Sequence, residues 1–170
     1  MFLESTGSLV LDRVNHIAYA AISPRTSRLL AHQWCADNHF ELVLFETENH
    51  LGCPIYHTDL MMFVGTSLIG VCLEAIKAPY REIVKSYVSR HHEILPITPQ
   101  QIQHFCANCL EVTNTQGDYF LVMSSRAVMS LRKEQKSVID RYYKRIIHSD
   151  LALIERYGGG SAHCLLAELF

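Results

Sequence analysis

One order of predicted elements, strand–strand–helix–strand, recurs along the chain about three times, at intervals of about 50 residues. In its first occurrence, residues 8–22 form two strands around a turn at 12–15, residues 26–38 form a helix, and residues 40–45 form a strand. The further predicted elements are strands 60–64, 68–73, 94–97, 110–112 and 119–123, helices 79–91, 99–105, 125–131 and 134–145, and a final strand pair around the glycine run 158–160 that ends in 164–169. This order favours an α/β fold built as a propeller-like or cyclic array of ββαβ units.

The composition predicts one globular domain over residues 1–170. Apolar residues make up 49% of the chain and charged residues 19%, and no low-complexity linker divides it. A net charge of −2 without a long Lys/Arg run argues against a nucleic acid or an acidic membrane as partner. The sequence also lacks an apolar run of roughly 18 residues and a signal peptide. We therefore expect a cytoplasmic protein whose six cysteines are thiols.

Three short segments carry groups suited to nucleophilic and acid–base chemistry. The run GGGSAHC places Cys164 just beyond a turn that three glycines keep free of side chains, where backbone N–H groups can support a thiolate. His57 and Asp59 are two residues apart, so on a strand they face one side as an acid–base and cation-binding pair. Glu4 precedes a Ser/Gly turn and can project into the same cavity. Taken singly, each segment also fits a purely structural role.

Histidine and cysteine spacing gives little support for a metal site. The chain has ten histidines, but none of them shows a zinc-binding spacing. Cys106 and Cys109 form a CxxC pair without a second pair at zinc-ribbon distance, which favours structural thiols over a metal or redox module. We expect neither a metal nor a cofactor.

In combination, these segments resemble one known family. Glu4-Ser-Thr-Gly-Ser, Arg25-Thr26, His57-Thr-Asp59 and the closing GGGSAHC run follow the order found in the guanidino-group-modifying superfamily. Its members include arginine deiminases, agmatine deiminases, dimethylarginine hydrolases and amidinotransferases. The chain looks most like the bacterial amidinotransferase or citrulline hydrolase branch, where runs similar to residues 9–13, 52–62, 121–131 and 158–170 recur. This resemblance covers essentially the whole chain. It implies the pentein fold, a propeller of five ββαβ units, about three of which are present here.

The resemblance also implies roles for the candidate residues. Cys164 looks like the nucleophile that attacks the guanidino or ureido carbon of a citrulline- or arginine-type substrate and forms a covalent thioether-linked intermediate. His57 looks like the general acid/base, with Glu4 as the carboxylate beside it. Asp59 looks like the group that holds the substrate nitrogens. The expected activity is hydrolysis of a C–N bond other than a peptide bond.

Two further residues receive substrate-binding roles from the same resemblance. Arg25 lies where arginine deiminases carry an arginine that can bind the α-carboxylate of the substrate. Asn108, in Phe-Cys-Ala-Asn-Cys, matches a run that usually reads Phe-x-Gly-Asn, which implies a place in the lining of the site. The expected partner is therefore a small guanidino or ureido amino acid.

The chain also departs from the family pattern. Ser5 stands where the family usually has glycine, which is expected to strain that turn, and His163 stands where the related branch usually has arginine. Family members carry a further half-domain before the Glu4 segment, so the single amidinotransferase-like domain is expected to be N-terminally truncated, with an open central site. A non-catalytic remnant or one part of a split protein is the alternative. Homo-oligomerisation, pairing with a missing N-terminal half, the identity of the substrate, and hydrolysis as against amidino transfer stay open.

Overall fold

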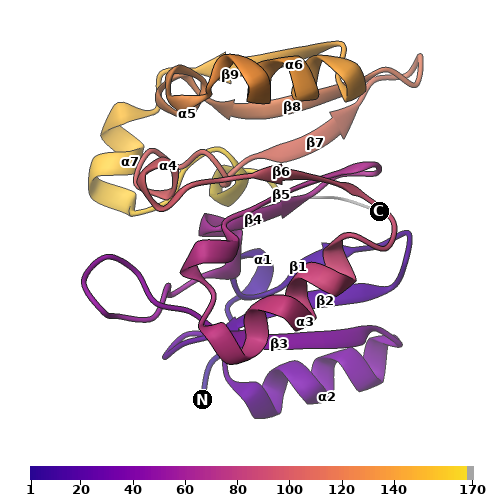
Figure 1. Cartoon of the computed structure of the whole chain (residues 1–170), viewed down its shortest axis with the longest axis vertical. Helices are drawn as coiled ribbons and strands as arrows, with labels where there is room; N and C mark the ends of the chain where they lie inside the picture. The colour runs from indigo at the N-terminus through magenta and orange to yellow at the C-terminus, as the bar shows by residue number, and fades with distance from the viewer. Residues whose placement is uncertain (168–170) are drawn as a thin grey trace.

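The computed structural model describes residues 1–167. This part of the chain contains three three-stranded sheets (Figure 1). In the first sheet, β1 (Val10–Asp12) pairs antiparallel with β2 (Ile17–Ile22), and β2 pairs in parallel with β3 (Glu41–Glu46). The helix α2 (Arg28–Asn38) makes the crossover between the two parallel strands, as a parallel connection requires. This segment is therefore one ββαβ unit.

The second and third sheets repeat this order. The second unit contains β4 (Met62–Val64), β5 (Leu68–Val71), the 3₁₀ helix η2 (Leu73–Ala75), α3 (Ala78–Val88) and β6 (Glu93–Pro96). The third contains β7 (Leu110–Thr113), β8 (Tyr119–Ser124), α5 (Ser125–Ser130), α6 (Lys133–Tyr142) and β9 (Arg145–Ser149). The short helix α4 (Pro99–Ile102) connects these two units. The predicted α/β fold is thus confirmed, and each of the three small sheets has the predicted strand order.

Two predicted elements near the C-terminus are wrong. The helix predicted over 134–145 ends at Tyr142, because the chain then enters the third sheet as β9. The predicted strand pair around the glycine run is instead the helix α7 (Ala152–Gly158), which ends at a left-handed Gly159 and is followed by the 3₁₀ helix η3 (His163–Leu165). Cys164 therefore lies in a 3₁₀ turn and not on a strand. Residues 168 and 169 of the predicted strand lie outside the described residues.

The three units stack in sequence order around one core, with the first at the bottom and the third at the top of Figure 1. The central strands β2 and β5 are buried along almost their whole length, as expected for strands paired on both edges. The first strands of neighbouring units contact one another, β1 with β4 and β4 with β7. Two one-turn helices, α1 (Ser5–Ser8) and η1 (Thr58–Leu60), precede β1 and β4 and also contact each other. The segments before the first strands are thereby brought together.

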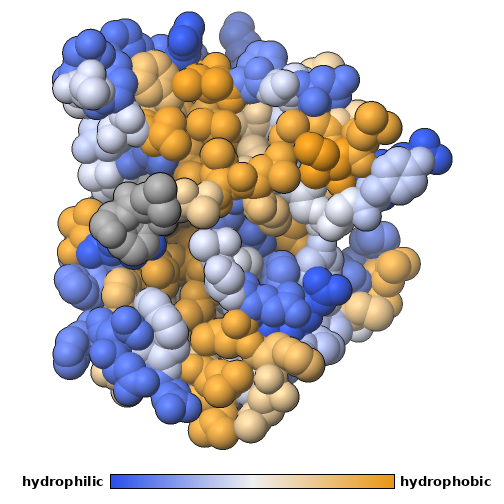
Figure 2. All heavy atoms as spheres, turned by 180° about the vertical axis from the view of Figure 1, so that it is seen from behind, coloured by the Kyte–Doolittle hydropathy of each residue, from blue (hydrophilic) through white to orange (hydrophobic). Residues whose placement is uncertain are grey.

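The face opposite to that of Figure 1 is rich in apolar side chains. Figure 2 shows them gathered at the top, over the third unit, and again near the bottom, over the first. Within residues 1–167, no helix combines the length and the apolar character needed to cross a membrane.

Candidate active site

The candidate site lies where the segments that precede the first strand of each unit meet. Glu4 comes shortly before β1, His57 and Asp59 come before β4, and Asn108 comes before β7. The chain then returns from α7 to the middle of the molecule and adds Cys164 (Figure 1). Equivalent positions in the three repeats thus supply the site, and the C-terminal segment supplies its thiol.

Glu4 and His57 share a hydrogen bond in which 2.7 Å separates Glu4 Oε2 from His57 Nε2. The Glu4 N–H donates to the buried Ser8 hydroxyl at 2.8 Å, and that hydroxyl donates to the Arg25 carbonyl at 2.9 Å. Ser5 has a φ of 40°, so the strain expected at this serine is confirmed. The carboxylate is thus held against the imidazole, as an acid–base pair requires.

Gly7 and Tyr56 fix the place of the His57 ring. A Cβ added at Gly7 would lie 2.6 Å from His57 Nδ1, so only glycine lets the imidazole lie this close to α1. The Tyr56 ring also packs against the imidazole, with 4.9 Å between the ring centroids. The position of His57 therefore depends on a missing side chain as well as on its carboxylate partner.

Asp59 does not share a strand with His57, contrary to the prediction. His57 is extended and precedes η1, whereas Asp59 lies inside this 3₁₀ helix. The Thr58 hydroxyl between them donates to the Ser8 carbonyl at 2.7 Å and accepts from the Ala21 N–H of β2 at 2.8 Å. Because Thr58 anchors the turn, the two flanking side chains have different partners. His57 contacts Glu4, and Asp59 contacts the segment that carries the thiol.

The nucleophile loop, residues 159–164, leads from the end of α7 to the thiol. Its Ser161 is fully buried, donates from its hydroxyl to Glu155 Oε1 at 2.7 Å, and donates from its N–H to Asn108 Oδ1 at 2.9 Å. A Cβ added at Gly160 would lie 2.7 Å from Cys164 Sγ. The loop is therefore anchored by two buried polar side chains, while the glycine leaves room for the sulfur.

The Cys164 sulfur lies between a carboxylate and an amide. Its S–H donates to Asp59 Oδ2 at 3.1 Å, and Asn108 Nδ2 donates to the sulfur at 3.3 Å. Cys164 as a residue is exposed, but burial of the thiol, together with the charge and hydrogen bond of Asp59, raises its pKa to about 11. The thiol is therefore protonated at neutral pH, and a positive charge beside Asp59 would favour its ionisation.

Asp59 keeps one carboxylate oxygen without a partner. Its side chain is only 2% exposed, and Oδ2 also accepts from His163 Nδ1 at 3.0 Å. Oδ1 is buried and has no hydrogen-bond partner among the described residues. Because buried polar atoms are rarely left unpaired, this oxygen marks a place where an N–H donor of a ligand would be stabilised.

Asn108 and Arg25 differ in how they fit their predicted substrate-binding roles. Asn108 is fully buried, and its amide donates both to the Asp59 carbonyl, at 3.2 Å, and to the thiol. At this position Asn108 is better placed to orient the thiol than to contact a substrate. Arg25 lies at the exposed edge of the site, 3.6 Å from Glu4 Oε2, where a substrate carboxylate could reach it.

Tyr56 connects His57 with the nucleophile loop, a contact that the sequence did not indicate. Its hydroxyl donates to the Gly159 carbonyl in the nucleophile loop, and its ring lies 5.0 Å below the Arg25 guanidinium. Glu155, the anchor of Ser161, was also missed, because nothing in the sequence distinguishes a buried glutamate from an exposed one. For Tyr56, the only available signal was its place next to His57.

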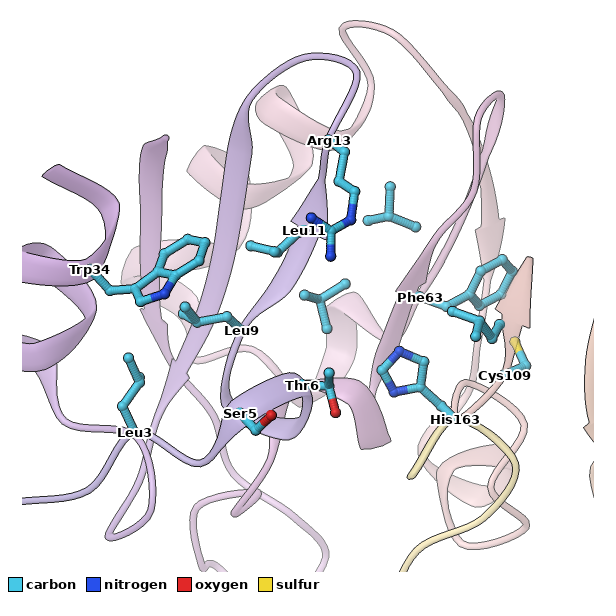
Figure 3. Close-up of a pocket in the computed structure, with 13 residues that line it drawn as sticks. Leu3, Ser5, Thr6, Leu9, Leu11, Arg13, Trp34, Phe63, Cys109 and His163 are labelled. Carbon is cyan, nitrogen blue, oxygen red and sulfur yellow. The ribbon is translucent and has the colours of Figure 1, made fainter. Parts of the chain in front are cut away.

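A cavity of about 280 Å³ lies beside the site, on the other side of His163. Its walls come mainly from apolar side chains of the first strands and of α2, including Leu11, Phe63 and Trp34. In Figure 3, the His163 ring forms part of the wall between Thr6 and Phe63. The lining residues include neither His57 nor Cys164, so this cavity is separate from both of these side chains.

The CxxC pair lies in the core. Cys106 and Cys109 are both buried, and burial raises the pKa of Cys106 to about 11 and that of Cys109 well above its usual value. In this environment they pack as apolar side chains. Across residues 1–167, no group of three or more His, Cys, Asp or Glu side chains is arranged to hold a metal ion.

Comparison with known families agrees with this geometry. A family described as N,N dimethylarginine dimethylhydrolase, eukaryotic, matches residues 1–170. The chain belongs to the dimethylarginine dimethylhydrolase family. The resemblance to the guanidino-group-modifying superfamily is thereby confirmed. Among curated proteins, none matches the chain in sequence.

Solved structures with the same fold include more distant proteins. The N-terminal domain of ArgZ, an arginine dihydrolase from the ornithine–ammonia cycle in cyanobacteria, superposes with a TM-score of 0.76 at 14% identity over 96% of this chain. SxtG, an amidinotransferase from Microseira wollei in the saxitoxin biosynthetic pathway, gives a TM-score of 0.59 at 15% identity over 92% of this chain. The chain spans 55% of that ArgZ domain, 24% of the longer ArgZ chain and 44% of SxtG. At these identities the likeness establishes the fold.

Proposed function

We propose that this member of the dimethylarginine dimethylhydrolase family is a cysteine hydrolase that cleaves a C–N bond at the guanidino or ureido carbon of an arginine- or citrulline-type amino acid. One observation carries the proposal. A thiol, a buried carboxylate oxygen that has no hydrogen-bond partner within residues 1–167, and a His–Glu pair meet from three segments that are distant in sequence. These are the groups needed for nucleophilic attack, for binding of a multi-donor planar group, and for proton transfer.

The first half-reaction forms a covalent intermediate. Substrate N–H groups donate to Asp59, the Cys164 thiol gives up its proton to solvent, and the sulfur attacks the planar carbon to form an S–C bond. His57 in its protonated form then gives its proton to the leaving nitrogen, and the C–N bond breaks. Glu4 holds the imidazole in place through this step.

The second half-reaction uses water. The now neutral His57 takes a proton from a water molecule, and the hydroxide adds to the thioether-linked carbon. The C–S bond breaks, the added oxygen loses its proton as C=O forms, and the thiolate takes up a proton from solvent, so that Cys164 and His57 return to their starting forms. The sum is substrate plus water giving a product with C=O in place of the lost C–N bond, plus ammonia or an amine.

The electrostatics of the site favour a cationic substrate. The raised pKa of Cys164 reflects burial and the negative charge of Asp59, and a guanidinium beside Asp59 would offset that charge. The thiolate would then form mainly when substrate is bound. A neutral ureido group lacks this effect, so we expect an arginine-type substrate to react faster than citrulline.

Product release from purified protein tests the proposal. Ammonia and amine should be measured with arginine, dimethylarginine and citrulline, for the wild type and for Cys164→Ala. Cys53→Ala is the matched control, because Cys53 is an exposed thiol whose N–H and S–H bond within its own turn, to Asn49 and Leu51. We expect release that Cys164→Ala abolishes and Cys53→Ala retains. Absence of release from every substrate, or equal release by Cys164→Ala, would contradict the proposal.

A further inference from the structure

His163 and Cys164 are neighbours in the chain and share one hydrogen-bond acceptor. Asp59 Oδ2 lies 3.0 Å from His163 Nδ1 and 3.1 Å from Cys164 Sγ. Because an ionised carboxylate only accepts hydrogen bonds, Nδ1 must carry the hydrogen. Both donors engage the same oxygen, and Oδ1 of the same carboxylate is buried without a partner among the described residues.

The histidine is held firmly enough to orient the carboxylate. Its side chain is 15% exposed and that of Asp59 is 2% exposed, so the bond between them is shielded from water. The His163 N–H also donates to the Asn108 carbonyl at 3.3 Å, which fixes the backbone from which the ring projects. Hydrogen bonds to a charged carboxylate are among the stronger ones in proteins.

The two donors behave differently once the reaction begins. The thiol donates to Asp59 only while it is protonated, and a thiolate at that distance repels the carboxylate instead. From that moment the N–H of His163 is what keeps Oδ2 turned towards the nucleophile loop. A carboxylate that kept only its bond to the thiol would be free to turn as the nucleophile formed.

We infer that His163 is a positioning residue that keeps Oδ1 of Asp59 directed at the guanidino or ureido group of the substrate. His163 thereby sets a preference for a cationic guanidinium over a neutral ureido group. The inference rests on the proposed function, since it takes Cys164 as the nucleophile. It concerns ligand charge and thiol reactivity, both of which can be measured without turnover.

Two small alkylating reagents separate the effect of ligand charge from the reactivity of the Cys164 thiol. Chloroacetamidine and chloroacetamide have nearly the same shape and the same leaving group, but only the amidine carries a positive charge near neutral pH. With either reagent an S–C bond forms, the C–Cl bond breaks, chloride leaves, and the thiol proton passes to the buffer. The rate constant at Cys164 is obtained by intact-mass measurement with peptide mapping, and the amidine-to-amide ratio is the readout.

Three variants complete the test. His163→Ala removes the donor, while His163→Asn restores an N–H at about the position of Nδ1. His148→Ala is the control, because His148 is an exposed histidine that pairs with Ser125 in the third unit. We expect His163→Ala to lower the ratio about 10- to 30-fold, as loss of one charge-assisted hydrogen bond would, with the amide rate changed less than about threefold. His163→Asn should recover the ratio to within about threefold, and His148→Ala should leave it unchanged.

Several results would overturn the inference. An unchanged ratio in His163→Ala would show that Asp59 needs no such partner, and an equal loss with both reagents would show only a disordered loop. Failure of His163→Asn to recover the ratio would also count against it. If the ratio shifts as expected but no guanidino or ureido compound is hydrolysed, the proposed function fails while the role of His163 in binding a cation stands.

Discussion

The two halves of the candidate site differ in how their carboxylates are paired: Glu4 has cationic or polar partners, whereas Asp59 lies beside a neutral thiol. In one half, Glu4 pairs with His57 and Arg25, and the Glu4 and Arg25 side chains are 40% and 54% exposed. The exposed Arg25–Glu4 pair contributes about 0–1 kcal/mol to stability, whereas the His57 side chain is 16% exposed and stays in contact with Glu4. In the other half, Asp59 is buried beside a protonated thiol, and its Oδ1 has no hydrogen-bond partner in the described part of the chain. The first half is complete in the free protein, whereas the second lacks a positive charge that a ligand can supply.

Removing the acid–base half should have the largest effect short of removing the thiol. His57→Asn is expected to lower kcat by about 10²- to 10⁴-fold, because the leaving nitrogen and the attacking water both lose their proton-transfer partner. Alkylation of Cys164 by chloroacetamidine should change less than about threefold, since that reaction needs no such partner. A comparable loss in both measurements would show that the two halves do not act separately.

Neutralising the buried half should have opposite effects on two kinds of ligand. Asp59→Asn is expected to lower kcat/KM for a guanidinium substrate by about 10²-fold or more, because a charge-assisted hydrogen bond is lost. The same change removes a charge and a hydrogen bond that raise the pKa of Cys164. The pKa then falls, the thiolate fraction rises at neutral pH, and neutral chloroacetamide should react faster. Slower reaction with the neutral reagent would contradict the cause assigned to the raised pKa.

Two glycines allow each half to be displaced separately. Gly7→Ala should push the His57 ring away and lower kcat by about 10-fold or more, while Cys164 alkylation stays unchanged. Gly160→Ala should displace the sulfur and lower kcat and alkylation together. Steady-state kinetics and alkylation rates on the same samples provide the check. Identical patterns for the two variants would mean that the halves move as one body.

The anchor of the nucleophile loop should affect stability more than chemistry. Ser161→Ala leaves Glu155 Oε1 buried without its donor, which is expected to cost about 1–3 kcal/mol. For a chain of this size that corresponds to a fall in Tm of roughly 2–10 °C. Ser137→Ala, which loses an exposed bond to the Lys133 carbonyl, should leave Tm within about 1 °C. Equal melting temperatures for the two variants would show that the loop does not depend on this bond.

Much of the fold was predictable, because apolar runs separated by turn residues mark most of the strands in all three units. The strand β9 was missed because it follows α6 closely and is mostly exposed, so no apolar pattern separates it from the helix. The end of the chain was misread because the glycine run that resembles a hairpin turn instead ends a helix at Gly159.

The candidate site was predictable as a set of residues but not as a geometry. Cys164, His57, Asp59 and Glu4 were identified from their order and their resemblance to a family. Their division into two halves depends on Thr58, whose hydroxyl bonds to segments far from it in sequence. Contacts of this kind follow from how the units pack, and local sequence does not encode them.

The most direct test of the account is to trap the covalent intermediate. The wild-type protein should be mixed with an excess of an arginine-type substrate, quenched in acid during turnover and analysed by mass spectrometry with peptide mapping. The proposed mechanism predicts a modification of Cys164 alone, with the mass of the substrate less the departing ammonia or amine, and no modification of Cys53. An unmodified Cys164 under conditions where the wild type turns over, or an adduct on another residue, would contradict it.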